Sequence, residues 1–205
     1  MSSAEKVSAR IQRMKRGVPF AISNFYPLGS RASIEKAMSR LAKEGVISRV
    51  SKGFYVRPKP LKSIPSINVT TSAKQVARAW AKENEYKLVS QGEESAYRLG
   101  FQTQAPVKEI FWSNGPSRRF EIGKEVVEVR HISKKKLRWA KLPVGELYRS
   151  FFSVSPESIG MPQMREALKR LSISEKESKS VLHKLSSAPL PSGWQQKLES
   201  LEKVV

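Results

Sequence analysis

Apolar residues in the first 57 positions follow a helical period twice and then alternate as in strands. Every third or fourth residue is apolar within residues 4–16 and again within residues 31–43, which predicts two helices. Residues 18–25 between them predict a short extended piece and one helical turn. After a glycine, residues 46–56 predict a hairpin of two short strands whose turn is Ser51-Lys52-Gly53.

This order of elements is typical of a winged helix-turn-helix domain, which we expect over residues 1–57. The second long helix has the width that a DNA major groove admits, and the hairpin would bring cations to neighbouring phosphates. We expect Phe54 and Val56 of the hairpin to pack on Leu41 and Ile34 and so fix its angle. The residues predicted to contact DNA are Ser30, Arg31, Ser33, Lys36, Arg40, Lys43, Arg49, Lys52 and Arg57.

The rest of the chain predicts a second, larger domain behind a linker. Residues 58–72 hold three prolines and several hydroxyls with little periodicity, which indicates an extended connector. Residues 73–205 predict a mixed α+β domain, in which residues 143–205 are expected to be helical. The predicted fold class is therefore α+β: an N-terminal winged helix-turn-helix domain, then a mixed C-terminal domain with a helical tail.

Charge narrows the class of partner. The chain has 38 Lys and Arg against 18 acidic residues, a net charge of +20, which favours a polyanionic partner. Residues 1–57 hold twelve basic and three acidic side chains and residues 74–142 hold fifteen and eight, so we expect the polyanion to bind these two regions. Such a basic helix face can also be merely solvated, and winged helices also serve as protein-interaction modules. We prefer double-stranded DNA as the partner because the excess of basic over acidic side chains in residues 1–57 is large.

Composition argues against an enzyme. The chain has no Cys and only two His, and all of its acidic residues are Glu, so the usual ligands of catalytic metals are scarce. No phosphate-binding loop, nucleophile elbow or His-Glu metal motif occurs. We therefore predict no catalytic residues, no metal and no cofactor. No apolar run is long enough to span a bilayer, which predicts no membrane partner and a cytoplasmic protein.

A second group of basic residues lies in the predicted C-terminal domain, at Arg118, Arg119, Arg130 and the run Lys134, Lys135 and Lys136. Trp139 follows this run. Its ring either stacks on a base or ribose or anchors the following segment in the core. The run itself is a solvated face, a continuation of the DNA footprint, or a site for RNA.

Three stretches resemble the antitoxins of the AbiE type, which pair with a toxin in bacterial abortive infection. They are "RLAKEGVISRVSKGFYVRP", "SQGEESAYRLGFQTQAPVKEIFWSNGPSRRFEIGKEVVEVRHI" and the helical tail. The middle stretch is the most specific, because many winged helices share the first. The resemblance implies a type IV toxin–antitoxin system, in which the N-terminal domain represses its own operon at inverted repeats. It also implies that the C-terminal domain counters a nucleotidyltransferase-like toxin without forming a stable complex, through the six basic residues of the second group. The alternative is a solitary regulator or interaction module without a toxin.

Overall fold

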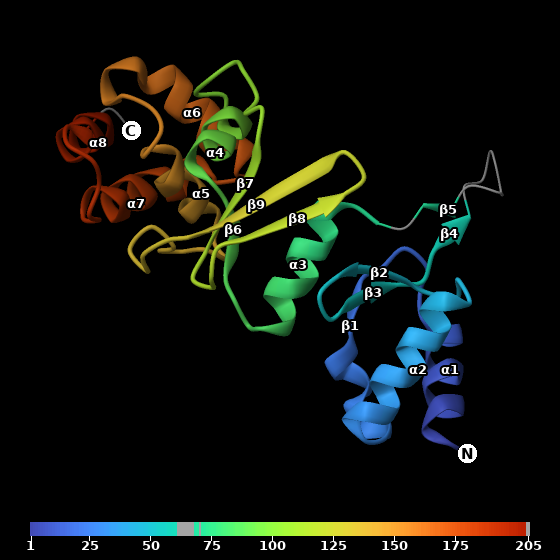
Figure 1. Cartoon of the computed structure of the whole chain (residues 1–205). Coiled ribbons are helices and arrows are strands. Elements are labelled where there is room, and N and C mark those ends of the chain that lie inside the picture. Colours follow the sequence, from blue (N-terminus) through green and yellow to red (C-terminus); the bar gives the residue numbers. More distant parts are fainter. Residues whose placement is uncertain (61–67, 70, 204–205) are drawn as a thin grey trace. The chain divides into compact units, whose positions relative to one another are not determined.

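The computed structural model describes residues 1–60, 68–69 and 71–203, and these form a mixed α+β protein (Figure 1). Most of the predicted connector, at residues 61–67 and 70, lies outside the described residues. Contacts divide the chain into two compact units. Unit 1 comprises residues 1–86 and 119–127, and unit 2 comprises residues 87–118 and 128–205. This division differs from the predicted boundaries at residues 57 and 72. None of the helices in the described residues is long and apolar enough to cross a membrane.

Unit 1 begins with helices and a small sheet. Its elements are α1 (Ser3–Arg13), β1 (Phe20–Ala21), the 3-10 helix η1 (Ile22–Leu28), α2 (Arg31–Lys43), β2 (Ser48–Ser51) and β3 (Phe54–Val56). Helix α1 starts in a capping box, in which Ser2 and Glu5 satisfy each other's backbone N–H groups. The strands form an antiparallel sheet in the order β1-β3-β2. Helices α1 and α2 pack against each other (Figure 1).

The core beneath these elements corrects one expectation. It contains Val7, Ile11, Phe20, Phe25, Ile34, Ala37, Met38, Leu41, Ile47 and Tyr55. The residue of β3 that packs in the same cluster as Ile34 and Leu41 is therefore Tyr55. The prediction that Phe54 and Val56 pack there is wrong. Side chains alternate across a strand, so the neighbours of Tyr55 point to the opposite face. Both are nevertheless buried, because β3 is covered on both of its faces.

The remainder of unit 1 follows the connector. Strands β4 (Lys59–Pro60) and β5 (Asn68–Val69) pair antiparallel within the stretch predicted as a connector. Helix α3 (Ala73–Glu83) is capped by Ser72, and its buried Trp80 packs 5.6 Å from Phe120 between ring centroids. The Glu125 carboxylate accepts hydrogen bonds from the first two backbone N–H groups of α3, at 3.0 and 3.3 Å. This negative charge stabilises the helix N-terminus.

Unit 2 combines a sheet with a helical bundle. Its strands are β6 (Leu88–Ser90), β7 (Glu109–Ser113), β8 (Arg118–Ile122) and β9 (Glu125–His131), in the order β6-β7-β9-β8. Residues 119–127, which are nearly all of β8 and the start of β9, are grouped with unit 1, so this sheet includes strands of both units. Its helices are α4 (Gly92–Leu99), α5 (Pro143–Ser150), the 3-10 turn η2 (Pro156–Ser158), α6 (Met161–Arg170), α7 (Glu175–Ser186) and α8 (Trp194–Glu202).

The helices of unit 2 gather together (Figure 1), and their buried side chains form one apolar core. At its centre Trp194 of α8 stacks on Phe151, with ring centroids 3.9 Å apart. Tyr148 of α5 is fully buried there, and its hydroxyl donates to the backbone oxygen of Pro189 at 2.9 Å. A buried tyrosine hydroxyl needs such a partner. The stretch predicted to be helical, residues 143–205, holds α5 to α8.

Candidate nucleic-acid interface

Helix α2 presents a polar face opposite its buried one. Ser30 caps the helix, and its hydroxyl accepts a hydrogen bond from the backbone N–H of Ser33 at 3.3 Å. Because the apolar residues of α2 occupy the core face, its polar residues are turned to solvent. The exposed basic residues of this face are Arg31, Lys36, Arg40 and Lys43.

The start of α1 lies beside this polar face, and the two helices border a shallow groove of about 630 Å³, here called the α1–α2 groove. Gly29 permits the close approach of the two helices, because a Cβ at this position would lie 2.3 Å from the Ser3 hydroxyl oxygen. Three of the four α2 cations reach the groove, so its wall on the α2 side is positively charged. The lining residues are Ser2, Ser3, Ala4, Ser33, Lys36, Ala37, Ser39, Arg40 and Lys43.

The four cations of the α2 face differ in how they are held. Arg31 pairs with Glu35 at 2.9 Å, and its guanidinium lies 5.7 Å from the centre of the Tyr26 ring. The hydrogen bond to Glu35, with help from Tyr26, raises the pKa of Arg31. Arg40 pairs more loosely with Glu44, at 3.6 Å. Lys36 and Lys43 form no ion pair within the described residues, so these two are the cations most available to a partner.

The β2–β3 hairpin carries further cations in unit 1. Its turn needs Gly53, whose φ of +78° lies in the left-handed region. The Gly53 carbonyl accepts a hydrogen bond from the backbone N–H of Ile22 at 2.9 Å, which ties the turn to η1. Arg49 and Lys52 are exposed, and neither has an ion-pair partner in the part of the chain that the structure describes.

Arg57, another predicted DNA contact, is half-buried and has a structural task. Its guanidinium donates to the backbone oxygens of Gln12 and Met14, at 2.6 and 3.3 Å. These carbonyls lie at the end of α1, where helical partners are missing. Arg57 therefore links the end of β3 to the end of α1, and a contact from it to DNA stays a prediction.

The second group of basic residues is not one uniform surface. Arg119 pairs with Glu121 at 2.5 Å and Arg130 with Glu128 at 2.8 Å, in each case two positions along the same strand. Arg119 is counted with unit 1, whereas the other five residues belong to unit 2. Arg118 is half-buried. The exposed Lys134 and Lys135 and the half-buried Lys136 follow β9 in a turn.

Trp139, for which two roles were open, is half-buried against the helical core. Its ring meets that of Tyr148 edge-on, with centroids 5.6 Å apart. The core-anchoring role is therefore present, while stacking on a nucleotide stays a prediction.

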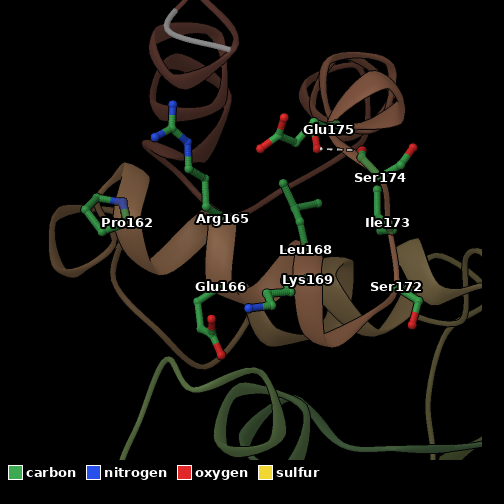
Figure 2. Close-up of a pocket in the computed structure, with 10 residues that line it drawn as sticks. Pro162, Arg165, Glu166, Leu168, Lys169, Ser172, Ile173, Ser174 and Glu175 are labelled. Atoms are coloured by element: carbon green, nitrogen blue, oxygen red, sulfur yellow. Dashed lines mark hydrogen bonds between the residues drawn. The ribbon is translucent and has the colours of Figure 1, made fainter.

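A separate groove, of about 910 Å³, lies between α6 and α7 (Figure 2). Figure 2 shows Arg165, Leu168 and Lys169 on α6 and Glu175 at the start of α7. The groove carries both positive and negative side chains. Its Glu166 forms an ion pair with Arg170, one turn further along α6, at 3.0 Å. No group of three His, Cys, Asp or Glu side chains in the described residues is arranged to hold a metal ion. We assign no chemistry to this groove.

The fold and the cationic α2 face define a mixed α+β protein with a basic N-terminal unit. The chain belongs to a family of unknown function (DUF6088), whose profile matches residues 6–147. Among solved structures it is similar to the RV2827C protein from Mycobacterium tuberculosis, at 16% sequence identity and a TM-score of 0.47. That match covers 98% of this chain and 76% of the other. No curated protein matches the chain.

Proposed function

We propose that the protein is a DNA-binding regulator whose N-terminal elements work as a winged helix-turn-helix. The observation that carries this proposal is the exposed cationic face of α2, with Lys36 and Lys43 unpaired among the described residues. Thirteen residues give α2 a length of about 20 Å, which suits a recognition helix in the major groove. Base edges would be read from this face, and phosphates would fix its position.

Phosphates would be bound at two places in unit 1. One is the α1–α2 groove, where Lys36, Arg40 and Lys43 face the start of α1, the end at which the helix dipole is positive. The other is the hairpin, where Arg49 and Lys52 would contact a neighbouring phosphate. These contacts supply affinity without sequence information, so specificity would rest on α2.

The antitoxin role is a second part of the proposal, and the resemblance to AbiE-type antitoxins supports it. In that role the protein represses its own operon and counters a nucleotidyltransferase-like toxin, with the lysines after β9 as the acting surface. Co-expression with the toxin gene from the same operon, scored by cell survival, tests it. If the toxin kills cells equally with and without this protein, the protein is a regulator without antitoxin activity. If the operon holds no toxin gene, the same conclusion follows.

DNA binding itself is tested on the purified full chain with duplexes selected from a random pool. We expect one sequence class to be enriched and its affinity to fall steeply with salt, with a slope of about −0.9 per phosphate contacted. A chain that binds none of the duplexes measurably, even at low salt, would instead favour a protein-interaction module.

A further inference from the structure

Four aromatic rings form a connected strip in unit 2, drawn from three separate segments. Trp112 of β7 lies 6.5 Å from Phe152, Phe152 lies 5.3 Å from Tyr148, and Tyr148 lies 5.6 Å from Trp139, measured between centroids. All three contacts are edge-on. Tyr148 is fully buried, whereas the other three rings are half-buried. The strip is therefore rooted in the core and reaches the surface at Trp112, Phe152 and Trp139.

Cations lie over the rings that reach the surface. The Lys136 Nζ lies 5.3 Å from the Trp112 centroid and 5.2 Å from that of Phe152. The Arg138 guanidinium and the Lys184 ammonium lie 5.3 and 5.2 Å from the centroid of the Trp139 ring. These distances are within the range of cation–π attraction. The cations come from both the turn after β9 and helix α7, so the arrangement is tertiary and not a run of sequence alone.

The surface around the strip is strongly positive. Five cations lie on the turn after β9 and a sixth, Lys184, lies near the end of α7, and none of these six forms an ion pair within the described residues. By contrast, Arg119 and Arg130 of the neighbouring strands are matched by glutamates. Lys136, Arg138 and Lys184 lie over the rings, and the other three cations belong to the same turn as the first two. The six cations are Lys134, Lys135, Lys136, Arg138, Lys141 and Lys184.

Trp139 is also held in an unfavourable backbone conformation. Its φ of +54° lies in the left-handed region, which a bulky side chain rarely adopts. Gly145 makes room for it, since a Cβ there would lie 2.0 Å from the Trp139 carbonyl oxygen. That oxygen accepts a hydrogen bond from the backbone N–H of Leu142 at 2.9 Å. Strain of this kind persists where the surroundings impose it, and it is concentrated at functional positions.

We propose that this surface binds single-stranded nucleic acid. The six cations bind the phosphodiester backbone, and bases stack on Trp112 and Trp139 after displacing the cations that now lie over the rings. Only a single strand offers unpaired base faces to a protein ring, so a duplex lacks half of this interaction. The site goes beyond the proposed duplex binding, because every residue of it belongs to unit 2. It shares the lysines after β9 with the proposed antitoxin surface and does not depend on the antitoxin role.

Binding is measured on the full chain with labelled single strands of about 12 nucleotides, one of uridines and one of thymidines, since one such site spans about 4–16 nucleotides. A duplex of the same length and inorganic polyphosphate are the comparison ligands. Tryptophan fluorescence reports stacking directly, because the other two tryptophans, Trp80 and Trp194, are buried. We expect quenching by the single strands and none by polyphosphate. A preference between the two strands distinguishes RNA from DNA as the ligand.

Substitutions at Trp139 test stacking. Trp139→Leu should weaken single-strand binding about tenfold, and Trp139→Phe should retain most of it because a ring remains. Trp139 also contacts the core, so a melting scan of each variant accompanies the titration. Substitutions at the exposed Lys134 and Lys135, which do not belong to the core, then give an independent test of the binding surface.

Substitutions at exposed lysines test the charge. Lys134→Ala with Lys135→Ala should reduce the steepness of the salt dependence by about 0.7 for each phosphate that is no longer bound. Lys169→Ala with Lys176→Ala removes the same charge from exposed positions elsewhere in unit 2 and should change little. The comparison shows whether binding depends on the place of the charge or only on its amount.

The outcomes also separate this site from the proposed duplex site. Lys36→Ala with Lys43→Ala should weaken duplex binding and leave single-strand binding unchanged. The proposal is overturned if single strands fail to quench fluorescence, or if the two unit 2 double-lysine variants weaken binding equally. It is also overturned if polyphosphate competes as well as an oligonucleotide, because the surface would then bind charge alone.

Discussion

At the scale of single residues, Arg149 of α5 is the most unusual charge in the molecule's described part. It is 4% exposed, its Nε donates to the Ser90 backbone oxygen at 3.1 Å, and its Nη1 has no hydrogen-bond partner. Burial lowers the pKa of Arg149 from its usual value to about 10, with Glu146 opposing the shift. A shift of this size corresponds to a cost of about 3 kcal/mol for keeping the charge inside.

We predict that Arg149→Met leaves the free energy of unfolding unchanged or raises it by about 1–3 kcal/mol. Glu146 is not stranded by the change, because Arg98 remains 3.2 Å from its Oε1. The pH dependence has a definite sign. Below a pH of about 10 the group is charged in both states and adds no slope, whereas above it the unfolded state binds more protons and stability rises. Denaturant melts of the two proteins check the prediction, and a clear decrease in the free energy of unfolding would contradict it.

At the scale of elements, helical period and strand alternation identified α1, α2 and the hairpin, because each helix has one dominant apolar face. The same reasoning misplaced Phe54 and Val56, since a strand buried on both faces gives no alternation from which to choose a side. The ion pairs of the two α2 arginines follow from i, i+4 spacing and could be predicted from the sequence. The role of Arg57 could not, because its partners lie 43 and 45 positions away.

The hairpin gives a prediction at the same scale. Lys52→Ala removes an exposed cation from the turn and should weaken binding to every duplex by a similar factor, because phosphates carry no sequence information. The salt slope should fall by about one unit. Titrations at several salt concentrations, on selected and scrambled duplexes, provide the measurement. Gly53 is left in place, since its positive φ holds the turn. An effect confined to the selected duplex would show that the hairpin reads bases.

At the scale of the whole molecule, the class of partner stays a prediction from composition, whereas the division of the chain depends on contacts that no local pattern reveals. Helix α3 looked like the start of the second domain, yet it is counted with unit 1. Its buried face includes Val76, Ala77 and Trp80, and its N-terminus is bound by Glu125. The chain passes between the two units three times, so this division by contacts differs from one made at a single linker.

Removal of residues 1–60 should therefore affect α3 and spare the helical core of unit 2. We predict that amide hydrogens of α3 exchange faster in this fragment, because part of the unit that contains the helix is gone. Amides of α5 and α8 should keep their protection, since Trp194 and Phe151 stay packed within unit 2. Hydrogen exchange followed by mass spectrometry distinguishes the two regions. Unchanged protection of α3 would place it outside the N-terminal unit.

The central claim, that α2 reads DNA, is tested most directly by the ratio of affinities for the selected and scrambled duplexes. Lys36→Ala should cost about 1–3 kcal/mol on the selected duplex and less on the scrambled one, if its ammonium reaches a base edge. Lys169→Ala in unit 2 is the matched control and should change neither affinity. We predict a ratio that falls toward one for Lys36→Ala, with Lys43→Ala measured beside it. Equal weakening on both duplexes for the two α2 variants would contradict the claim and leave α2 as a phosphate contact only.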